Sequence, residues 1–253
     1  MLDDQKVTAA PQRAPTSPRP FGLIDGLLAS LGGVLSVAVL LLLPAGLVPG
    51  GTWLWPQGLW FVGVTGAISL AGNGALAVAR PEHFGVRQQS VVASKEKQQP
   101  LIDAVGSAGL IAFSVAWLIF IPVDVFRLHL LPAPSPALSI VGGVCVVIAE
   151  LLTFLAVWEN KFATPNLQQQ NGQKVIDTGI YSFIRHPIYA GTLLRSGGIP
   201  LWLGSSAAFF GVGVVLVATV GRILIEEAHL RANVPGYEDY ARRVRGRVIP
   251  FVL

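Results

Sequence analysis

Two polar clusters, each beside an apolar run, contain the residues of this chain whose types and spacing suit chemistry. The first is Arg185-His186-Pro187-Ile188-Tyr189, immediately before or at the start of an apolar stretch. The second is Arg222 followed by Glu226 and Glu227, near the end of the next apolar stretch. Guanidinium, imidazole and carboxylate groups together can bind a ligand that carries both charges, because each charge finds an opposite partner. The two clusters are therefore candidates for one binding site.

The composition places the elements that carry these clusters in a membrane. Hydrophobic residues make up 52% of the 253 residues and charged residues 13%, with a mean hydropathy of +0.60, which excludes an ordinary soluble domain. A spanning helix needs roughly 20 mostly apolar residues. Backbone groups in hydrocarbon must pair internally, so runs without strand alternation predict an all-α, polytopic membrane helical bundle of about six spans. The runs are 23–43, 59–79, 104–121, 137–157, 187–203 and 207–225.

The turn Leu203-Gly204-Ser205-Ser206 between the last two runs predicts a tight helical hairpin. Both polar clusters would then lie at the open end of this hairpin, on one side of the membrane. Residues 1–20 are polar and rich in Pro, Ala and Ser, which predicts a disordered cytoplasmic tail. Residues 21–253 are expected to form a single membrane domain, with two longer polar loops at 80–100 and 159–186.

The distribution of Lys and Arg predicts the orientation, because cytoplasmic loops carry the excess of these residues. Basic residues precede the first run, follow the second and fourth, and fill the tail, whereas the opposite loops hold only Arg127. Both termini and the cluster around His186 are therefore predicted to be cytoplasmic, in a multi-pass protein of the cell (inner) membrane. The net charge of +4 is attributed to this excess of Lys and Arg in the cytoplasmic loops, and no nucleic-acid site is predicted. The single cysteine, Cys145, allows neither an internal disulfide nor a thiolate metal cluster, and no metal site is predicted.

The start of the fifth run favours an anionic ligand. The residue before a proline prefers an extended backbone, while proline suits the first turn of a helix. Arg185 and His186 are therefore expected at the membrane surface, beside free amides and the positive end of the helix dipole. The alternative is that both side chains anchor the helix to lipid phosphates. Arg222 and Glu226 are four residues apart and can form a plain intrahelical ion pair, an explanation that Glu227 lacks.

The order and spacing of these motifs resemble those of the membrane isoprenylcysteine carboxyl methyltransferases and the related phospholipid methyltransferases. The resemblance spans 173–251, the expected catalytic region. Asn233-Val234-Pro235-Gly236 departs from the family, which more often shows an aromatic residue followed by glycine and acidic residues here. The motifs are Thr178-Gly179-Ile180-Tyr181, Arg185-His186-Pro187-x-Tyr189-x-Gly191, Arg222, Glu226-Glu227-x-x-Leu230, Tyr237-x-x-Tyr240 and Ile249-Pro250.

The resemblance implies S-adenosylmethionine as the methyl donor, bound at the cytoplasmic ends of the last helices. Its polar end is assigned to the amides around Gly179, Ile180 and Tyr181 and to the side chains of Arg185 and His186, and its ammonium group to Glu226 or Glu227. Tyr181, Pro187 and Tyr189 are expected to line the adenosyl pocket. In catalysis, Arg222 would hold a carboxylate acceptor, whereas a thiol or amine acceptor needs a base, either His186 or a glutamate. A short amphipathic helix with Tyr237 and Tyr240 would cap the site or rest on the head groups.

Three polar residues fall inside apolar runs, where ionisable groups usually face a partner or a cavity. Arg195, Glu150 and Asn73 either line an acceptor tunnel or, for Arg195 and Glu150, form a structural ion pair. The acceptor is expected to be lipophilic or lipid-linked, with membrane lipids as the other partners. Two other functions stay open. One is a membrane NADPH-dependent enone or sterol reductase, against which the paired glutamates argue by repelling phosphates, and the other is a non-enzymatic scaffold or transporter.

Overall fold

The computed structural model describes residues 22–93, 101–164 and 172–250, and within these ranges it contains helices and no strand. The predicted all-α membrane bundle is confirmed. Five segments are long and apolar enough to cross a membrane, and they coincide with five of the six predicted runs: Leu23–Leu47, Pro56–Ala79, Ala108–Leu128, Pro136–Glu159 and Ala207–Asn233. The predicted tail at 1–20 lies outside the described residues.

Helix α6 (Pro187–Leu203) forms where the fifth run was predicted, but it has only 17 residues. At 1.5 Å per residue it is roughly 25 Å long, somewhat less than the hydrocarbon thickness of about 30 Å. The helix is confirmed, whereas its role as a sixth span stays a prediction.

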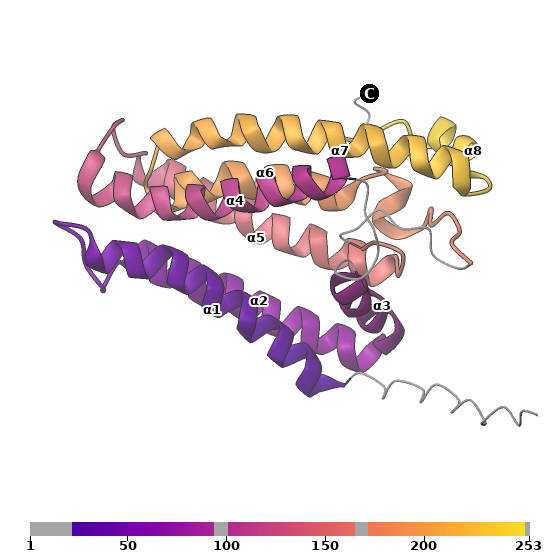
Figure 1. The fold of residues 1–253 in the computed structure, drawn as a ribbon, viewed down its shortest axis with the longest axis horizontal. Coiled ribbons are helices and arrows are strands. Elements are labelled where there is room, and N and C mark those ends of the chain that lie inside the picture. Colours follow the sequence, from indigo (N-terminus) through magenta and orange to yellow (C-terminus); the bar gives the residue numbers. More distant parts are fainter. Residues whose placement is uncertain (1–21, 94–100, 165–171, 251–253) are drawn as a thin grey trace, which may run out of the picture.

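The helices form two layers (Figure 1). Helices α1 (Leu23–Leu47) and α2 (Pro56–Ala79) make one layer, and α4 (Leu101–Val123), α5 (Pro136–Glu159), α6 and α7 (Gly211–Asn233) make the other. The two short helices, α3 (Pro81–Ala93) and α8 (Tyr237–Arg243), lie at the same end of the bundle. The main core joins both layers and includes Leu41, Phe61, Trp117, Ile121 and Leu203. One end of the bundle therefore collects the polar connections.

Helix α3 corrects the prediction of a polar loop over 80–100. Pro81 occupies the first turn and Glu82 supports the positive end of the helix dipole, so the segment has a helix start. Its polar composition gave no apolar run, which is why the sequence pattern missed it. Phe84 of this helix is fully buried in a cluster with Leu76 and Val157, which packs the helix against the bundle.

Helices α5 and α6 pack closely through small residues. A Cβ atom at Gly191 would lie 2.9 Å from the Ala149 carbonyl oxygen, and one at Gly198 would lie 2.6 Å from that of Gly142. Glycine is required at these contacts because any side chain would push the helices apart.

The hairpin between α6 and α7 has the predicted tight turn. Gly204 ends α6 in the left-handed region, with φ of 92°, which favours glycine. Ser205 is fully buried and donates to Asp124 Oδ2 at 2.6 Å, while its hydroxyl oxygen accepts from the Ala208 amide at 3.1 Å. These bonds tie the turn to the π-helical segment η1 (Asp124–Leu128) at the end of α4. The open ends of α6 and α7 therefore return to one side of the bundle.

Candidate active site at the joined ends of helices α6 and α7

The segment before α6 is shaped by a glycine. Gly179–Ser182 form a 3₁₀ turn, η2, in which Gly179 has a φ of 55°. A Cβ atom there would approach Glu159 Cδ to 2.9 Å, so both the backbone conformation and the space favour glycine. The turn buries Tyr181, whose hydroxyl donates to the Ala156 carbonyl at 3.4 Å. Burial raises the pKa of this hydroxyl well above its usual range.

The C-terminal segment after α8 packs against the start of α6. The Arg185 amide donates to the Gly246 carbonyl at 2.9 Å and the His186 amide to the Arg247 carbonyl at 2.8 Å. Both side chains are buried, with 8% of Arg185 and 5% of His186 exposed. This corrects the expectation that both side chains project at the membrane surface. The contact joins segments some sixty residues apart in sequence, which no local pattern indicates.

Glu227 is the centre of an ion-pair cluster, which we call the Glu227 hub. Its Oε1 forms an ion pair with Arg185 Nη1 at 2.8 Å and lies 3.2 Å from His186 Nε2. Its Oε2 accepts from Arg231 Nη2 at 3.1 Å and from Arg247 Nε at 3.3 Å. The Glu227 side chain is only 1% exposed. Both carboxylate oxygens are therefore committed to cationic partners within the chain, and the predicted clusters on α6 and α7 meet here.

Glu226, the next residue along α7, has different surroundings. Its Oε2 accepts a hydrogen bond from the Tyr189 hydroxyl at 2.7 Å, which joins α7 to the first turn of α6. Arg222, one turn earlier on α7, interacts with the same hydroxyl. We call Tyr189, Arg222 and Glu226 the Tyr189 mouth. All three are partly exposed, so this carboxylate, tyrosine and guanidinium remain accessible to a ligand.

Helix α8 covers the Glu227 hub from outside. Tyr237, Tyr240, Val234 and Val244 form a buried cluster, and the Tyr240 hydroxyl donates to the Tyr181 carbonyl at 2.8 Å. Burial raises the pKa of both Tyr237 and Tyr240. Of the two predicted roles for this amphipathic helix, packing over the site is therefore observed, while its outward face remains charged, with exposed Glu238 and Arg242.

Two buried polar atoms near the hub have no hydrogen-bond partner within the described part of the chain. They are Arg185 Nε and the Tyr237 hydroxyl oxygen, and Arg185 is among the charges that act on Tyr237. Leaving such groups unpaired costs about 1–3 kcal/mol each. An N–H donor and a hydroxyl in one neighbourhood match the oxygens of a carboxylate, so the residues present fit the anionic end of an amino-acid-like ligand.

A cavity of about 390 Å³ lies between the layers, and its nearest lining residue to Tyr189 on α6 is Thr192. Arg195 Nη1 donates to Glu150 Oε1 at 3.1 Å, and both residues line this cavity. Arg195 and Glu150 therefore form the predicted ion pair and also line a cavity, so the two alternatives are compatible. Asn73 differs, because its amide donates to the Ser30 hydroxyl at 2.9 Å between α1 and α2 and it does not line this cavity.

The cavity and the mouth lie along the same helix faces. On α6, Thr192 and Ser196 line the cavity three and seven residues after Tyr189, a spacing that keeps side chains on one face. On α7, Val215 lines it eleven residues before Glu226, again on one face. The cavity thus lies along α6 and α7, beginning about one turn from Tyr189 on α6 and about 16 Å from Glu226 on α7.

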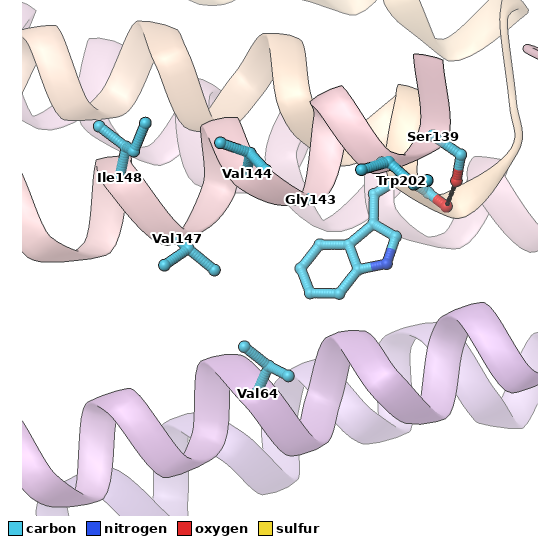
Figure 2. A pocket seen from close by; sticks show the side chains of 8 residues that line it. Val64, Ser139, Gly143, Val144, Val147, Ile148 and Trp202 are labelled. Carbon is cyan, nitrogen blue, oxygen red and sulfur yellow. Dashed lines mark hydrogen bonds between the residues drawn. The ribbon is translucent and has the colours of Figure 1, made fainter. Parts of the chain in front are cut away.

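A second cavity of about 390 Å³ opens between α2 and α5 and is almost entirely apolar. Figure 2 shows Val64 of α2 across from Val147 and Trp202, with Ser139 bonded to the Trp202 carbonyl. The Trp202 ring packs edge-on against Phe61, 5.3 Å between centroids. Because Phe61 lines the other cavity, this ring pair stands between the two. The apolar cavity offers no group for chemistry.

Sequence reasoning missed two partners of Glu227, which are Arg231 and Arg247. It also missed that the Tyr237 hydroxyl is buried without a hydrogen-bond partner in the described part of the chain. Arg231 follows Glu227 by four residues on α7 and forms the intrahelical ion pair that Glu227 was expected to lack, so that expectation was wrong. Arg247 has no such signal, because it reaches the hub only through the fold of the C-terminal segment. The inward direction of Tyr237 depends on the same fold.

Part of the chain that contains these site residues matches a known family. Residues 138–234 match the model of the phospholipid methyltransferase family, a range that contains Tyr189, Arg222, Glu226 and Glu227. The predicted resemblance is confirmed over this segment. Together with the apolar helices, the match indicates an integral-membrane methyltransferase.

Among solved structures, the chain is similar to a eukaryotic intramembrane Ras methyltransferase, isoprenylcysteine carboxyl methyltransferase. The identity is 18% and the TM-score 0.43, over 91% of this chain and 87% of that one. No curated protein matched the sequence.

Proposed function

We propose that this chain transfers a methyl group from S-adenosylmethionine to a lipophilic or lipid-linked acceptor that carries a carboxylate, thiol or amine. The observation that supports the proposal is the hydrogen bond between Tyr189 and Glu226, beside the Glu227 hub. It brings the two polar clusters together inside the segment that matches the methyltransferase family. The positive residues of the loops on this side favour a cytoplasmic position for the site.

The chain offers a partner for each part of the cofactor. Glu226 is the better partner for the ammonium group, because both oxygens of Glu227 already accept from cations. Arg185 Nε and the Tyr237 hydroxyl suit the carboxylate. Tyr181, Pro187 and Tyr189 provide flat and apolar surfaces for the adenosyl group, and the amides near Gly179 and Ile180 provide further donors. When bound, the cofactor supplies an electrophilic methyl group on a sulfonium.

The remaining residues position the acceptor. Arg222 is placed at the mouth to hold an anionic acceptor or to stabilise charge that develops there. His186 Nε2 faces Glu227 Oε1. If the ring donates to this carboxylate, Nε2 carries the proton and Nδ1 is the basic nitrogen of the imidazole. His186 therefore serves as the base for a thiol or amine acceptor. Alignment of the acceptor can contribute roughly 7–11 kcal/mol in ideal cases.

The apolar part of the acceptor is assigned to the cavity beneath the mouth. This cavity lies between apolar side chains of both layers, including Val34, Val37 and Phe61, and apolar surface removed from water contributes roughly 25 cal/mol per Å². An acceptor held there would present its reacting group at the Tyr189 mouth.

Calorimetry in detergent tests the choice of cofactor. We expect the wild-type protein to bind S-adenosylhomocysteine saturably and to show no binding of NADPH. Binding of NADPH alone would reject the methyltransferase and support a reductase. Absence of binding for either nucleoside would favour a scaffold or transporter.

Transfer of a labelled methyl group to a panel of lipophilic carboxylates, thiols and amines tests the acceptor side. Arg222→Met is expected to lower turnover about 100-fold while changing the affinity for S-adenosylhomocysteine less than threefold, since Arg222 is assigned to the acceptor. Arg242→Met removes an exposed guanidinium on α8 and is the matched control, with turnover unchanged. Equal loss in both variants would contradict the role of Arg222.

A further inference from the structure

The cavity near the Tyr189 mouth is lined mostly by apolar side chains, with one pair of charged side chains among them. Arg195 and Glu150 form this pair, with 39% and 19% of their side chains exposed. A hydrogen bond joins Arg195 Nη1 to Glu150 Oε1. A carboxylate can accept several hydrogen bonds and a guanidinium can donate five. The pair therefore has capacity for a ligand group that both donates and accepts.

Hydroxyl groups around the pair add acceptors to the wall. Thr192 donates to the Ile188 carbonyl at 2.9 Å, Thr65 to that of Phe61 at 2.7 Å, and Ser114 to that of Leu110 at 2.7 Å. Their protons are used within their own helices, so these three hydroxyls present lone pairs to the cavity. A ligand that donates a hydrogen bond is favoured here.

The net charge of the lining limits the ligand further. Among the described residues that line the cavity, Glu150 and Arg195 are the only charged ones, and they neutralise each other. A second full charge brought to this depth would have no counter-charge, which costs several kcal/mol in a low-dielectric site. A neutral hydroxyl or amide incurs no such cost.

We infer that the acceptor of the proposed methyl transfer carries an uncharged polar group, an amide or hydroxyl, about 9 Å from the atom that is methylated. The spacing follows from α6, where Arg195 lies six residues after Tyr189 at a rise of about 1.5 Å per residue. The acceptor is thus an apolar chain interrupted by one neutral polar group, which the Arg195 and Glu150 pair recognises. This inference rests on the proposed function.

Matched probes test it by binding alone. Three amphiphiles of equal length share a terminal head group and differ at about 9 Å from it, where they carry methylenes, a secondary amide or a carboxylate. Each is made with a carboxylate, thiol or amine head, and its affinity is measured from thermal stabilisation of the wild-type protein without cofactor. The amide probe is expected to bind about tenfold more tightly than the methylene probe, as one hydrogen bond to a charged group allows. Equal affinity, or tightest binding of the carboxylate probe, would overturn the inference.

Two variants locate the effect. Glu150→Leu with Arg195→Leu replaces the pair by apolar residues, an exchange that is often neutral for stability, and is expected to abolish the preference for the amide. Glu150→Gln leaves Arg195 without its counter-charge and is expected to favour the carboxylate probe about tenfold over the amide. An amide preference that survives in either variant would show that the pair only joins α5 to α6. Binding of S-adenosylhomocysteine, measured separately, reports on the proposed function itself.

Discussion

The Glu227 hub and the Tyr189 mouth are neighbours built on adjacent residues of α7, yet they differ in how their carboxylates are used. Glu227 is buried and surrounded by Arg185, His186, Arg231 and Arg247. Glu226 is partly exposed and accepts from one tyrosine. Successive positions on a helix point about 100° apart, so one of two adjacent glutamates faces the packed interior and the other faces the opening. The pair thus combines a structural charge with an accessible one.

The largest effect is expected from Glu227→Ala. Removing this carboxylate leaves the buried Arg185 guanidinium without its counter-charge, which costs about 3–5 kcal/mol. Chemical unfolding in detergent should show a midpoint far below that of the wild type. Glu238→Ala removes a carboxylate that is 55% exposed and should have a nearly unchanged midpoint. A stable Glu227→Ala protein that has lost only cofactor binding would reverse the assignment of the two glutamates.

Glu226→Gln should show the opposite pattern, with a normal unfolding midpoint and weak binding. The amide keeps the shape and can still accept from Tyr189, but it loses the charge that pairs with an ammonium group. A charge-assisted hydrogen bond contributes about 1.5–3 kcal/mol, so calorimetry should give an affinity for S-adenosylhomocysteine about 10- to 100-fold lower. Unchanged affinity would remove Glu226 from the cofactor site.

The contrast between hub and mouth also separates what the sequence predicted from what it could not. The apolar runs, the turn at Gly204 and the meeting of the α6 and α7 clusters follow from local patterns, because helix length and a short connection fix which ends are neighbours. The partners of Glu227 do not, since Arg247 arrives through a C-terminal segment that bonds to the Arg185 and His186 amides. The sequence pattern missed helix α3 because this helix has no apolar stripe and packs through one large buried side chain, Phe84.

Tyr240→Phe tests the packing of α8 over the hub. The variant loses the hydrogen bond to the Tyr181 carbonyl and leaves that buried oxygen unpaired, at a cost of about 1–2 kcal/mol. Burial raises the pKa of the Tyr240 hydroxyl, so its contribution to stability is complete below the ordinary tyrosine pKa and falls as the pH rises above about 10. The difference in unfolding midpoint between variant and wild type should therefore shrink at alkaline pH. A constant difference would assign the loss to packing instead of this hydroxyl.

Tyr189→Phe is expected to have the smallest effect, because it keeps the ring and removes one hydroxyl at the mouth. Glu226 loses the 2.7 Å hydrogen bond that orients it, which should weaken binding of S-adenosylhomocysteine about two- to tenfold, as expected for one hydrogen bond of about 0.5–1.5 kcal/mol. Because the tyrosine acts through Glu226, the double variant with Glu226→Gln should bind no more weakly than Glu226→Gln alone. Additive losses would mean that the Tyr189 hydroxyl contacts the cofactor itself, and the mouth would then hold two independent ligand contacts.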